Sequence, residues 1–393
     1  MSMSSPEVHR LLAEAAARGA APALEAGFGA AGLLDPRALT AAGPVLLVAS
    51  ERAVRNIPLA ADLLAAGASH YGRTHPNPTT DDVIALSALI EQFRPRTIVA
   101  IGGGSTIDLA KAARLLCPDR LSIDAGLRGD TSSMRADPPE VIAVPTLAGT
   151  GAEVTPFATL YRNRRKVSLD APAVRPERAV LDGSLVLSAP PEHSVPALLD
   201  ALCHAVEAGW SRARTPESKR AAVVAREALV AHLSAPLAVR DVHQAQELLS
   251  ATTLAGTAIA VSRTTAAHAF SYHLTAEYGI PHGFACAMSM SWVEKHLADR
   301  RPGICSPKVR AAAEAIRRVL ARAEVDGLVE SPRLSGGRLE AYIDAGLSTQ
   351  TRLSGHPVRI DRDSARRFVM WDGFLTYPRG NAVASAHLLD SYA

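Results

Sequence analysis

The sequence predicts an α/β domain over residues 1–190 followed by an all-helical domain over residues 191–393. Two patterns support this prediction. Before Pro190, short apolar segments alternate with helical segments, an order that is typical of a parallel sheet with helices on both faces. After Pro191, the apolar residues recur at helical spacing through the rest of the chain. We therefore place the domain boundary at this pair of prolines.

Length and composition limit the class of protein. With 393 residues the chain is long enough to form two cores. Its 42 basic and 39 acidic residues leave a net charge of +3, which is too small to indicate nucleic-acid binding. The four cysteines contain no CxxC pair, as is typical of reduced thiols in the cytoplasm. We expect no secretory leader and no membrane span. We therefore expect a cytoplasmic globular protein without nucleic-acid or membrane partners.

The elements of the first domain follow in order. An Ala-rich helix and a connection occupy the chain up to about residue 40, and an amphipathic helix is expected at residues 81–93. Sheet strands are predicted at residues 45–49, 69–74, 97–101, 141–144 and 179–182, and a hairpin at residues 155–162 and 166–169. Sheets of this kind bind ligands beyond the carboxyl ends of their strands.

Two loops rich in small residues begin at such strand ends. The first is Gly102-Gly-Gly-Ser-Thr-Ile-Asp-Leu-Ala-Lys111, in which Ser105 and Asp108 resemble a capping box that opens a helix. Amides at a helix N-terminus bind phosphate, although a strand-to-helix turn alone also requires glycine. The second loop is Pro145-Thr-Leu-Ala-Gly-Thr-Gly-Ala-Glu153. Two such loops suit a dinucleotide, which extends across several strand ends.

The second domain contains a carboxylate and an imidazole in an apolar helix. This helix is predicted to begin at Ser194 as its N-cap and to stop at Gly209. Asp200 and His204 stand at i and i+4, so they share one face. A buried carboxylate is costly unless it is paired, and a cation lowers that cost. The alternative is an Asp and a His that only hydrogen-bond each other.

A second pair of candidate ligands lies further along the chain. Gly279 is predicted to end the helix that contains His268, and Pro281 to open the helix that begins near His282. Two imidazoles then converge across a tight turn. Together with Asp200 and His204 they make a ligand set that suits Fe²⁺ or Zn²⁺.

These features together resemble the iron-containing (group III) alcohol dehydrogenases, which are related to dehydroquinate synthase. The resemblance covers the chain from Gly27 to Arg379. It implies a Rossmann-like domain that binds NADPH or NADH, an all-helical domain that binds Fe²⁺ or Zn²⁺, and oxidoreductase activity on alcohols or aldehydes. Its markers are Asn77 in Pro-Asn-Pro, Gly102 to Ser105 with Asp108 and Lys111, the Pro145 to Glu153 loop, the Asp200/His204 helix and the His268/His282 pair.

The resemblance also implies roles for single residues. Asp200, His204, His268 and His282 match the four metal ligands of the family. The cofactor contacts are expected at Ser50, Asn77, Gly102, Gly103, Gly104, Ser105, Asp108, Thr146, Leu147, Thr150, Thr155, Lys166 and Leu181.

The chain departs from the family pattern at two places. Many members carry His four residues after the third ligand, where this chain has Tyr272 with His273 beside it. We expect Tyr272 or His273 to supply the proton of the reaction through water. Near the end of the chain, Tyr377-Pro-Arg stands where Asn-Pro-Arg is common.

Cofactor preference is predicted from the end of the first strand. Enzymes that prefer NAD usually place a carboxylate there, which repels a 2′-phosphate. Here the position is occupied by Ser50, followed by Glu51 and Arg52. We therefore expect NADPH to be used at least as well as NADH, with Arg52 or Arg55 meeting the phosphate.

The polar run Val261-Ser-Arg-Thr-Thr265 precedes the third ligand. We expect Arg263 and Thr264, with Phe157, to contact the substrate, and Arg263 to receive an anionic group. The alternative is that Arg263 extends to solvent or pairs with an acidic neighbour. With the motifs around the later histidines, this run resembles the branch of the family that reduces phosphonoacetaldehyde to 2-hydroxyethylphosphonate in phosphonate biosynthesis.

Three functions therefore compete. The first is a metal-dependent aldehyde reductase or alcohol dehydrogenase, acting on an anionic aldehyde or on general short-chain alcohols. The second is a relative of the sugar-phosphate cyclases or glycerol-phosphate dehydrogenases. The third is a binding protein without activity. The resemblance further implies a homodimer.

Overall fold

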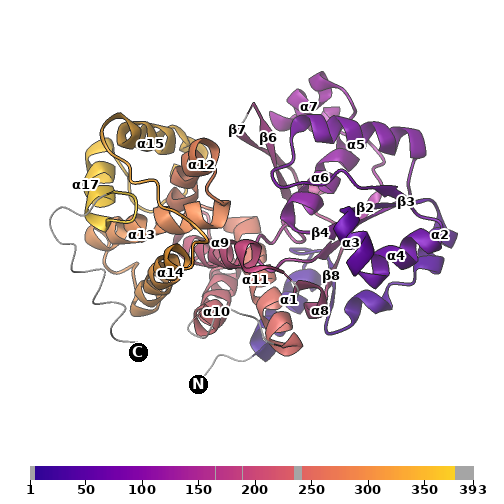
Figure 1. The fold of residues 1–393 in the computed structure, drawn as a ribbon, viewed down its shortest axis with the longest axis horizontal. Coiled ribbons are helices and arrows are strands. Elements are labelled where there is room, and N and C mark those ends of the chain that lie inside the picture. Colours follow the sequence, from indigo (N-terminus) through magenta and orange to yellow (C-terminus); the bar gives the residue numbers. More distant parts are fainter. Residues whose placement is uncertain (1–4, 164, 188, 234–240, 377–393) are drawn as a thin grey trace.

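The computed structural model describes residues 5–163, 165–187, 189–233 and 241–376. These residues form an α/β lobe and a helical lobe that lie side by side (Figure 1). The predicted fold class is therefore confirmed, with a six-stranded parallel sheet in the first half of the chain and helices in the second. The departure from the family pattern at Tyr377 lies outside the described residues.

The sheet has the strand order β1-β8-β5-β4-β2-β3, and every neighbouring pair is parallel. The strand at the β1 edge was not predicted. A separate antiparallel hairpin forms where the sequence indicates one. The strands are β1 (Ala23–Ala26), β2 (Val45–Ala49), β3 (Ser69–Tyr71), β4 (Thr97–Gly102), β5 (Glu140–Pro145), β6 (Phe157–Arg162), β7 (Arg165–Asp170) and β8 (Arg178–Leu181).

Both faces of the sheet are covered, which explains the unbroken apolar runs of the central strands. On β2, Leu46 and Val48 join one core cluster, whereas Val45 and Leu47 join the cluster on the opposite face. The elements of this lobe are η1 (Ala30–Leu33), α2 (Pro36–Ala42), α3 (Glu51–Asn56), α4 (Pro58–Ala65), α5 (Thr80–Phe93), α6 (Gly104–Leu115), α7 (Arg120–Leu127), η2 (Thr131–Ser133), η3 (Pro172–Val174) and α8 (Gly183–Val186).

The helical lobe is built around one central, almost fully buried helix, α9 (Pro191–Trp210), which packs against α10, α11 and α13. Its predicted limits are slightly wrong. The helix begins three residues before Ser194 because Pro190 serves as its N-cap, and it continues one residue past Gly209. The other helices are α10 (Pro216–Leu233), α11 (Val242–Ser262), α12 (Ala266–Tyr278), α13 (His282–Arg300), α14 (Pro307–Val325), α15 (Gly336–Ser348), α16 (Gln350–Leu353) and α17 (Arg362–Asp372).

The first helix, α1 (Ser5–Ala17), packs on the helical lobe although it precedes the sheet in sequence (Figure 1). It contacts α10 and α11, and Val8, Leu11 and Leu12 belong to the core cluster of the helical lobe. The first domain as predicted, residues 1–190, therefore includes a helix that packs with the other lobe. Within the described residues, no helix has the length and apolar character that a membrane span requires.

Candidate active site

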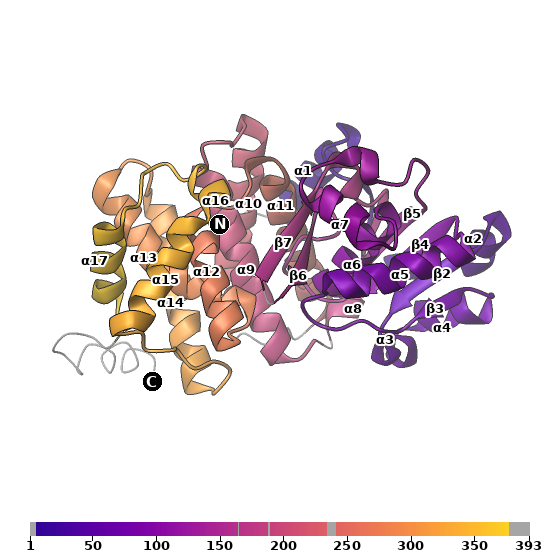
Figure 2. The ribbon, with the colours of Figure 1, turned by 90° about the horizontal axis from the view of Figure 1, so that it is seen from above.

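A cleft of about 900 Å³ lies between the two lobes. Its walls come from the loops after β2, β4 and β5, from the β6–β7 hairpin, and from helices α9, α12 and α13. Figure 2 shows the hairpin beside the helical lobe, close to α9 and α12. A cleft of this size is large enough for a cofactor fragment and a small substrate together.

The α/β wall of the cleft lies where the sheet changes direction. The next two strands in sequence, β3 and β4, lie on opposite sides of β2. The loops after β2 and β4 therefore diverge and leave a crevice between them. Ser50 and Gly102 begin these two loops. A Cβ atom on Gly104 would lie 2.4 Å from Oγ1 of Thr150, so glycine lets the two small-residue loops touch.

The predicted capping box at Ser105 and Asp108 is wrong. Helix α6 has Gly103 as its N-cap, and no side chain caps it. The Ser105 hydroxyl instead accepts a hydrogen bond from the backbone amide of Asn77, at 3.2 Å. Asp108 accepts from the amide of Thr159 at 2.9 Å and from the buried ammonium of Lys111 at 3.1 Å. The side chains of Ser105 and Asp108 are therefore engaged with these partners and do not cap the helix.

The structure gathers most of the predicted cofactor residues on the cleft wall. Leu181 is different, because it is fully buried in the core and does not line the cleft. The residues that do line it are Ser50, Asn77, Gly102, Gly103, Gly104, Ser105, Asp108, Thr146, Leu147, Thr150, Thr155 and Lys166.

Three imidazoles from three helices converge on one carboxylate oxygen. The Nε2 atoms of His268, His204 and His282 lie 3.2, 3.4 and 4.0 Å from Oδ1 of Asp200. A tetrahedral ion with bonds of roughly 2.1 Å needs donor atoms about 3.4 Å apart. The spacing and the donor types therefore fit a divalent metal ion of the Fe²⁺ or Zn²⁺ kind.

The position of His282 depends on the glycine that follows it. Pro281 is the N-cap of α13, and His282 is the first residue of the helix. A Cβ atom on Gly283 would lie 1.7 Å from the backbone oxygen of Pro196 in α9. Only glycine therefore lets the start of α13 approach α9 closely enough to bring His282 to Asp200.

The charge states of three of these four groups suit a bound cation. His268 is the exception, because burial lowers its pKa but Cys286, Glu207 and Asp200 outweigh burial and raise it well above its usual value. Burial raises the pKa of Asp200, but the imidazoles of His204, His282 and His268 outweigh it and hold that pKa well below its ordinary value. Burial lowers the pKa of His204 to about 4. Burial and the nearby Lys166 ammonium also hold the pKa of His282 well below its usual range. His204 and His282 are thus neutral near pH 7, and each neutral ring has one nitrogen lone pair that can bind a metal.

Glu207 supports the cluster through a contact with His268, and its role was not predicted from the sequence. Its Oε2 atom lies 2.5 Å from Nδ1 of His268, while Oε1 accepts hydrogen bonds from the Thr265 hydroxyl and the Ala267 amide. A carboxylate on the far nitrogen of a liganding histidine fixes the ring and its tautomer. The available signal was its position seven residues after Asp200, about two turns along the same apolar helix.

Cys286 is a second residue that the sequence argument missed. It follows His282 by one helical turn, and its Sγ atom lies 3.6 Å from Nε2 of His282. Ligand atoms of Cys286, Asp200, His268 and His282 all lie within 4.8 Å of one another. Burial raises the pKa of the Cys286 thiol, so the sulfur is protonated and a weaker donor than the imidazoles.

The two candidate proton donors occupy different environments. Tyr272 lines the cleft, with its ring 6.0 Å from the His282 ring and Lys166 Nζ 4.4 Å from its centroid. His273 does not line the cleft. Its ring packs against Tyr278 and Tyr342, at centroid distances of 5.9 and 6.3 Å.

The three predicted substrate residues do not all line the cleft. Thr264 and Phe157 line the cleft, but Arg263 does not. The Nη1 atom of Arg263 lies 3.2 Å from Oδ2 of Asp170, and its guanidinium stacks over the Phe157 ring at 4.9 Å. The acidic partner anticipated as the alternative is therefore present in the structure.

Comparison with known proteins agrees with this geometry. The family model described as iron-containing alcohol dehydrogenase matches residues 26–183, and the model of the C-terminal part of that family matches residues 194–329. The chain belongs to the iron-containing alcohol dehydrogenase family. It is therefore an oxidoreductase that acts on CH–OH groups, and the predicted nicotinamide cofactor and iron are those of its family.

Individual members of the family extend the comparison. The chain is 38% identical over 332 residues to phosphonoacetaldehyde reductase of Streptomyces viridochromogenes, covering 75% of this chain and 81% of that protein. An iron-containing alcohol dehydrogenase of Thermotoga maritima has a TM-score of 0.77 at 26% identity, over 89% of this chain and 97% of the other. Sulfoacetaldehyde reductase of Bifidobacterium kashiwanohense, solved with NAD⁺, shares the fold at 24% identity, with a TM-score of 0.77 over 90% of this chain and 97% of that one.

Proposed function

We propose that this oxidoreductase reduces a small anionic aldehyde, of the phosphonoacetaldehyde kind, to the corresponding alcohol. The observation that carries the proposal is the similarity to phosphonoacetaldehyde reductase, which extends over 81% of that enzyme. The cleft supports it, because the four candidate ligands and the strand-end loops face the same space.

Asp200, His204, His268 and His282 are the proposed metal ligands, and Glu207 orients His268. The residues of the two small loops, with Ser50, Asn77 and Lys166, are the proposed cofactor contacts. When bound, the nicotinamide supplies the hydride and the divalent ion polarises the aldehyde oxygen. The chain itself holds the aldehyde between these groups and limits the access of water.

Tyr272 is the proposed source of the proton that the product alcohol requires. Burial raises the pKa of its hydroxyl, but the cations of Lys166 and Arg352 outweigh burial and lower that pKa below its ordinary value. A hydroxyl with a lowered pKa gives up its proton more readily. His273, the other candidate, lies outside the cleft wall.

Two further proposals concern the whole molecule. The enzyme is proposed to act in the cytoplasm, in keeping with its four free cysteines. It is proposed to form a homodimer, as the resemblance to the family implies. Light scattering of the purified protein tests the second proposal, and a monomer at micromolar concentration would contradict it.

A substrate panel tests the catalytic proposal. The purified enzyme, loaded with Fe²⁺, is given NADPH and either phosphonoacetaldehyde or neutral propionaldehyde, and oxidation of the nicotinamide is followed. We expect oxidation with both aldehydes, a higher kcat/KM with phosphonoacetaldehyde, and loss of activity on chelation that Fe²⁺ restores. A preference for propionaldehyde would contradict the anionic substrate. Absence of aldehyde-dependent oxidation would contradict the reductase and favour a cyclase-type reaction, in which the cofactor is not consumed.

A further inference from the structure

Arg352 is a cation of the cleft that no sequence motif indicated. It lies on the short helix α16, seventy residues beyond His282, the last candidate metal ligand in the sequence. Its side chain nevertheless lines the cleft that contains Asp200, His268 and His282. We propose that Arg352 binds the anionic group of the substrate and thereby sets the preference for anionic aldehydes, an inference that rests on the proposed reductase function.

The charge of Arg352 has no acidic partner. Among the described residues, no carboxylate oxygen lies within 4.0 Å of a side-chain nitrogen of Arg352. The same holds for Lys166, a second cation on this part of the cleft wall. Asp170, which contributes to the field at Arg352, is paired with Arg263. Keeping two cations partly buried without counter-ions is unfavourable, and an anionic ligand removes that cost.

The neighbours of Tyr272 match the two ends of such a substrate. Lys166 Nζ lies 3.3 Å from Nε2 of His282 and 4.4 Å from the centroid of the Tyr272 ring, so this cation lies beside the candidate metal ligands. The Tyr272 ring lies 6.0 Å from the His282 ring, and the Tyr272 hydroxyl interacts with Arg352 and raises the pKa of its guanidinium. A short two-carbon substrate can therefore place its aldehyde oxygen near His282 and its phosphonate near Arg352.

Arg263, the residue first expected to bind the anion, has a structural role instead. It is the C-cap of α11 with φ of 59° and ψ of 170°, a backbone conformation that side-chain-bearing residues rarely adopt. Its guanidinium contacts Asp170 and the Phe157 ring, both on the hairpin. Arg263 thus ties the end of α11 to the β6–β7 hairpin, and its charge is already compensated.

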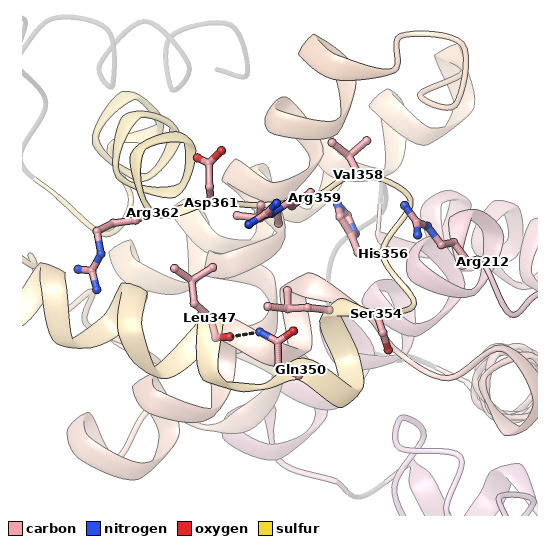
Figure 3. Close-up of a pocket in the computed structure, with 11 residues that line it drawn as sticks. Arg212, Leu347, Gln350, Ser354, His356, Val358, Arg359, Asp361 and Arg362 are labelled. Atoms are coloured by element: carbon pink, nitrogen blue, oxygen red, sulfur yellow. Dashed lines mark hydrogen bonds between the residues drawn. The ribbon is translucent and has the colours of Figure 1, made fainter.

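The other arginine-rich cavity does not compete for this role. A second cavity of about 540 Å³ is lined by Arg212, Arg359 and Arg362, and by Gln350 and Leu353 of α16 (Figure 3). Arg362 pairs with Glu340 at 2.9 Å, and Arg212 donates to the backbone oxygen of Pro357 at 3.0 Å. None of the candidate metal or cofactor residues lines this cavity. Of the α16 residues, Gln350 and Leu353 line this cavity, whereas Arg352 lines only the cleft.

Selectivity between two aldehydes tests the proposal. We compare wild type, Arg352→Ala and the matched control Arg263→Ala by kcat/KM for phosphonoacetaldehyde and for propionaldehyde. Loss of a charge-assisted contact lowers the rate by roughly 10- to 150-fold. We expect Arg352→Ala to lower the ratio of the two kcat/KM values by that factor, mainly through KM for phosphonoacetaldehyde. We expect Arg263→Ala to change the ratio by less than about threefold.

Two further measurements separate binding from structural damage. Arg352→Lys keeps the charge but loses the planar fork, so we expect it to retain part of the selectivity. Added guanidinium chloride at low millimolar concentration should restore part of the phosphonoacetaldehyde activity of Arg352→Ala but not that of Arg263→Ala. Thermal unfolding of each variant shows whether it is folded.

The outcomes distinguish this inference from the proposed function. If wild type prefers phosphonoacetaldehyde but Arg352→Ala loses activity equally on both aldehydes, or Arg263→Ala shifts the ratio more, the role of Arg352 is overturned while the reductase stands. If wild type reduces propionaldehyde better than phosphonoacetaldehyde, the anionic substrate itself is wrong. If Arg352→Ala does not fold, Arg352→Gln replaces it, and a ratio equal to that of wild type overturns the proposal.

Discussion

The Nδ1 atom of His268 lies 2.5 Å from Oε2 of Glu207, and this contact joins the candidate metal cluster to the buried centre of α9. Glu207 is fully buried and also accepts hydrogen bonds from Thr265 and from the amide of Ala267. The same carboxylate therefore fixes both the ring of His268 and the start of the helix that carries it.

Replacing Glu207 by Gln should weaken metal binding without removing a ligand. The amide cannot carry the negative charge that raises the basicity of His268, so we expect metal affinity to fall by roughly 10- to 100-fold. Competition with a chelator measures the affinity. Glu294→Gln is the matched control, because Glu294 is also a buried carboxylate but pairs with Arg317 at 2.9 Å. Equal losses of metal affinity in the two variants would show a general loss of stability instead.

Replacing His282 by Ala should reduce metal binding more than the Glu207 change does, because it removes a proposed ligand. We expect a loss larger than the roughly 100-fold limit of supporting residues. Metal content after gel filtration measures it. His273→Ala is the control, since His273 packs on Tyr278 outside the cleft. A His282→Ala protein that retains one metal ion per chain would remove this residue from the ligand set.

The cofactor prediction is testable at Arg52. Arg52 lines the cleft beside Ser50, whereas the Glu51 carboxylate lies 3.8 Å from Nδ1 of His70 and is not part of the wall. We expect wild type to use NADPH at least as well as NADH. We expect Arg52→Ala to lower the NADPH to NADH ratio of kcat/KM by roughly 10-fold or more, because a phosphate contact is charge-assisted.

Arg55→Ala serves as the control for Arg52, because Arg55 lies on the same short helix but does not line the cleft. A tenfold or greater preference of the wild type for NADH would contradict the prediction. So would an equal change of the ratio in the two variants.

The stability of the protein should depend on pH through His356. This imidazole is buried beside Trp210 and Thr265, and burial lowers its pKa from 6.5 to about 4. The unfolded chain binds the proton more readily, so the contribution to stability is complete above pH 6.5 and is lost as the pH falls toward 4. Between pH 7 and pH 5 this loss is about 2 kcal/mol.

Urea unfolding at these two pH values tests the assignment. His356→Asn has no titrating group at this position, so we expect its free energy of unfolding to fall about 2 kcal/mol less than that of wild type between pH 7 and pH 5. Metal-saturated protein is used for both, because proton release by the metal ligands would otherwise contribute. Parallel pH profiles of the two proteins would refute the assignment.

Sequence patterns were sufficient where the function depends on local spacing. The i and i+4 positions of Asp200 and His204, and the turn between His268 and His282, depend on helix geometry within a few residues. The structure brings all four side chains together. The alternation of strands and helices likewise predicted a parallel sheet, because strands buried on both faces consist of unbroken apolar runs.

The features that were missed depend on contacts between distant segments. Strand β1 has no apolar run, because it is an edge strand that pairs only with β8. Ser105 loses its capping role to Asn77, twenty-eight residues away in sequence. Arg352 lines the cleft because α16 packs against α12. No local sequence pattern around residue 352 predicts that packing. Arg263 is close to His268 in sequence, but its side chain pairs with Asp170 and not with the candidate metal site.

The position of α1 on the helical lobe has a mechanical consequence. The chain crosses between the lobes twice, before β1 and after β8, and these two strands are neighbours at one edge of the sheet. Two adjacent connections at one edge of the sheet allow the lobes to rotate about that edge. In such a rotation the far edge, with β3 and the loop after β2, would move most, and the start of α9, which leads to Asp200, would move least. The connectivity therefore places the freedom to open the cleft at the edge opposite the two connections.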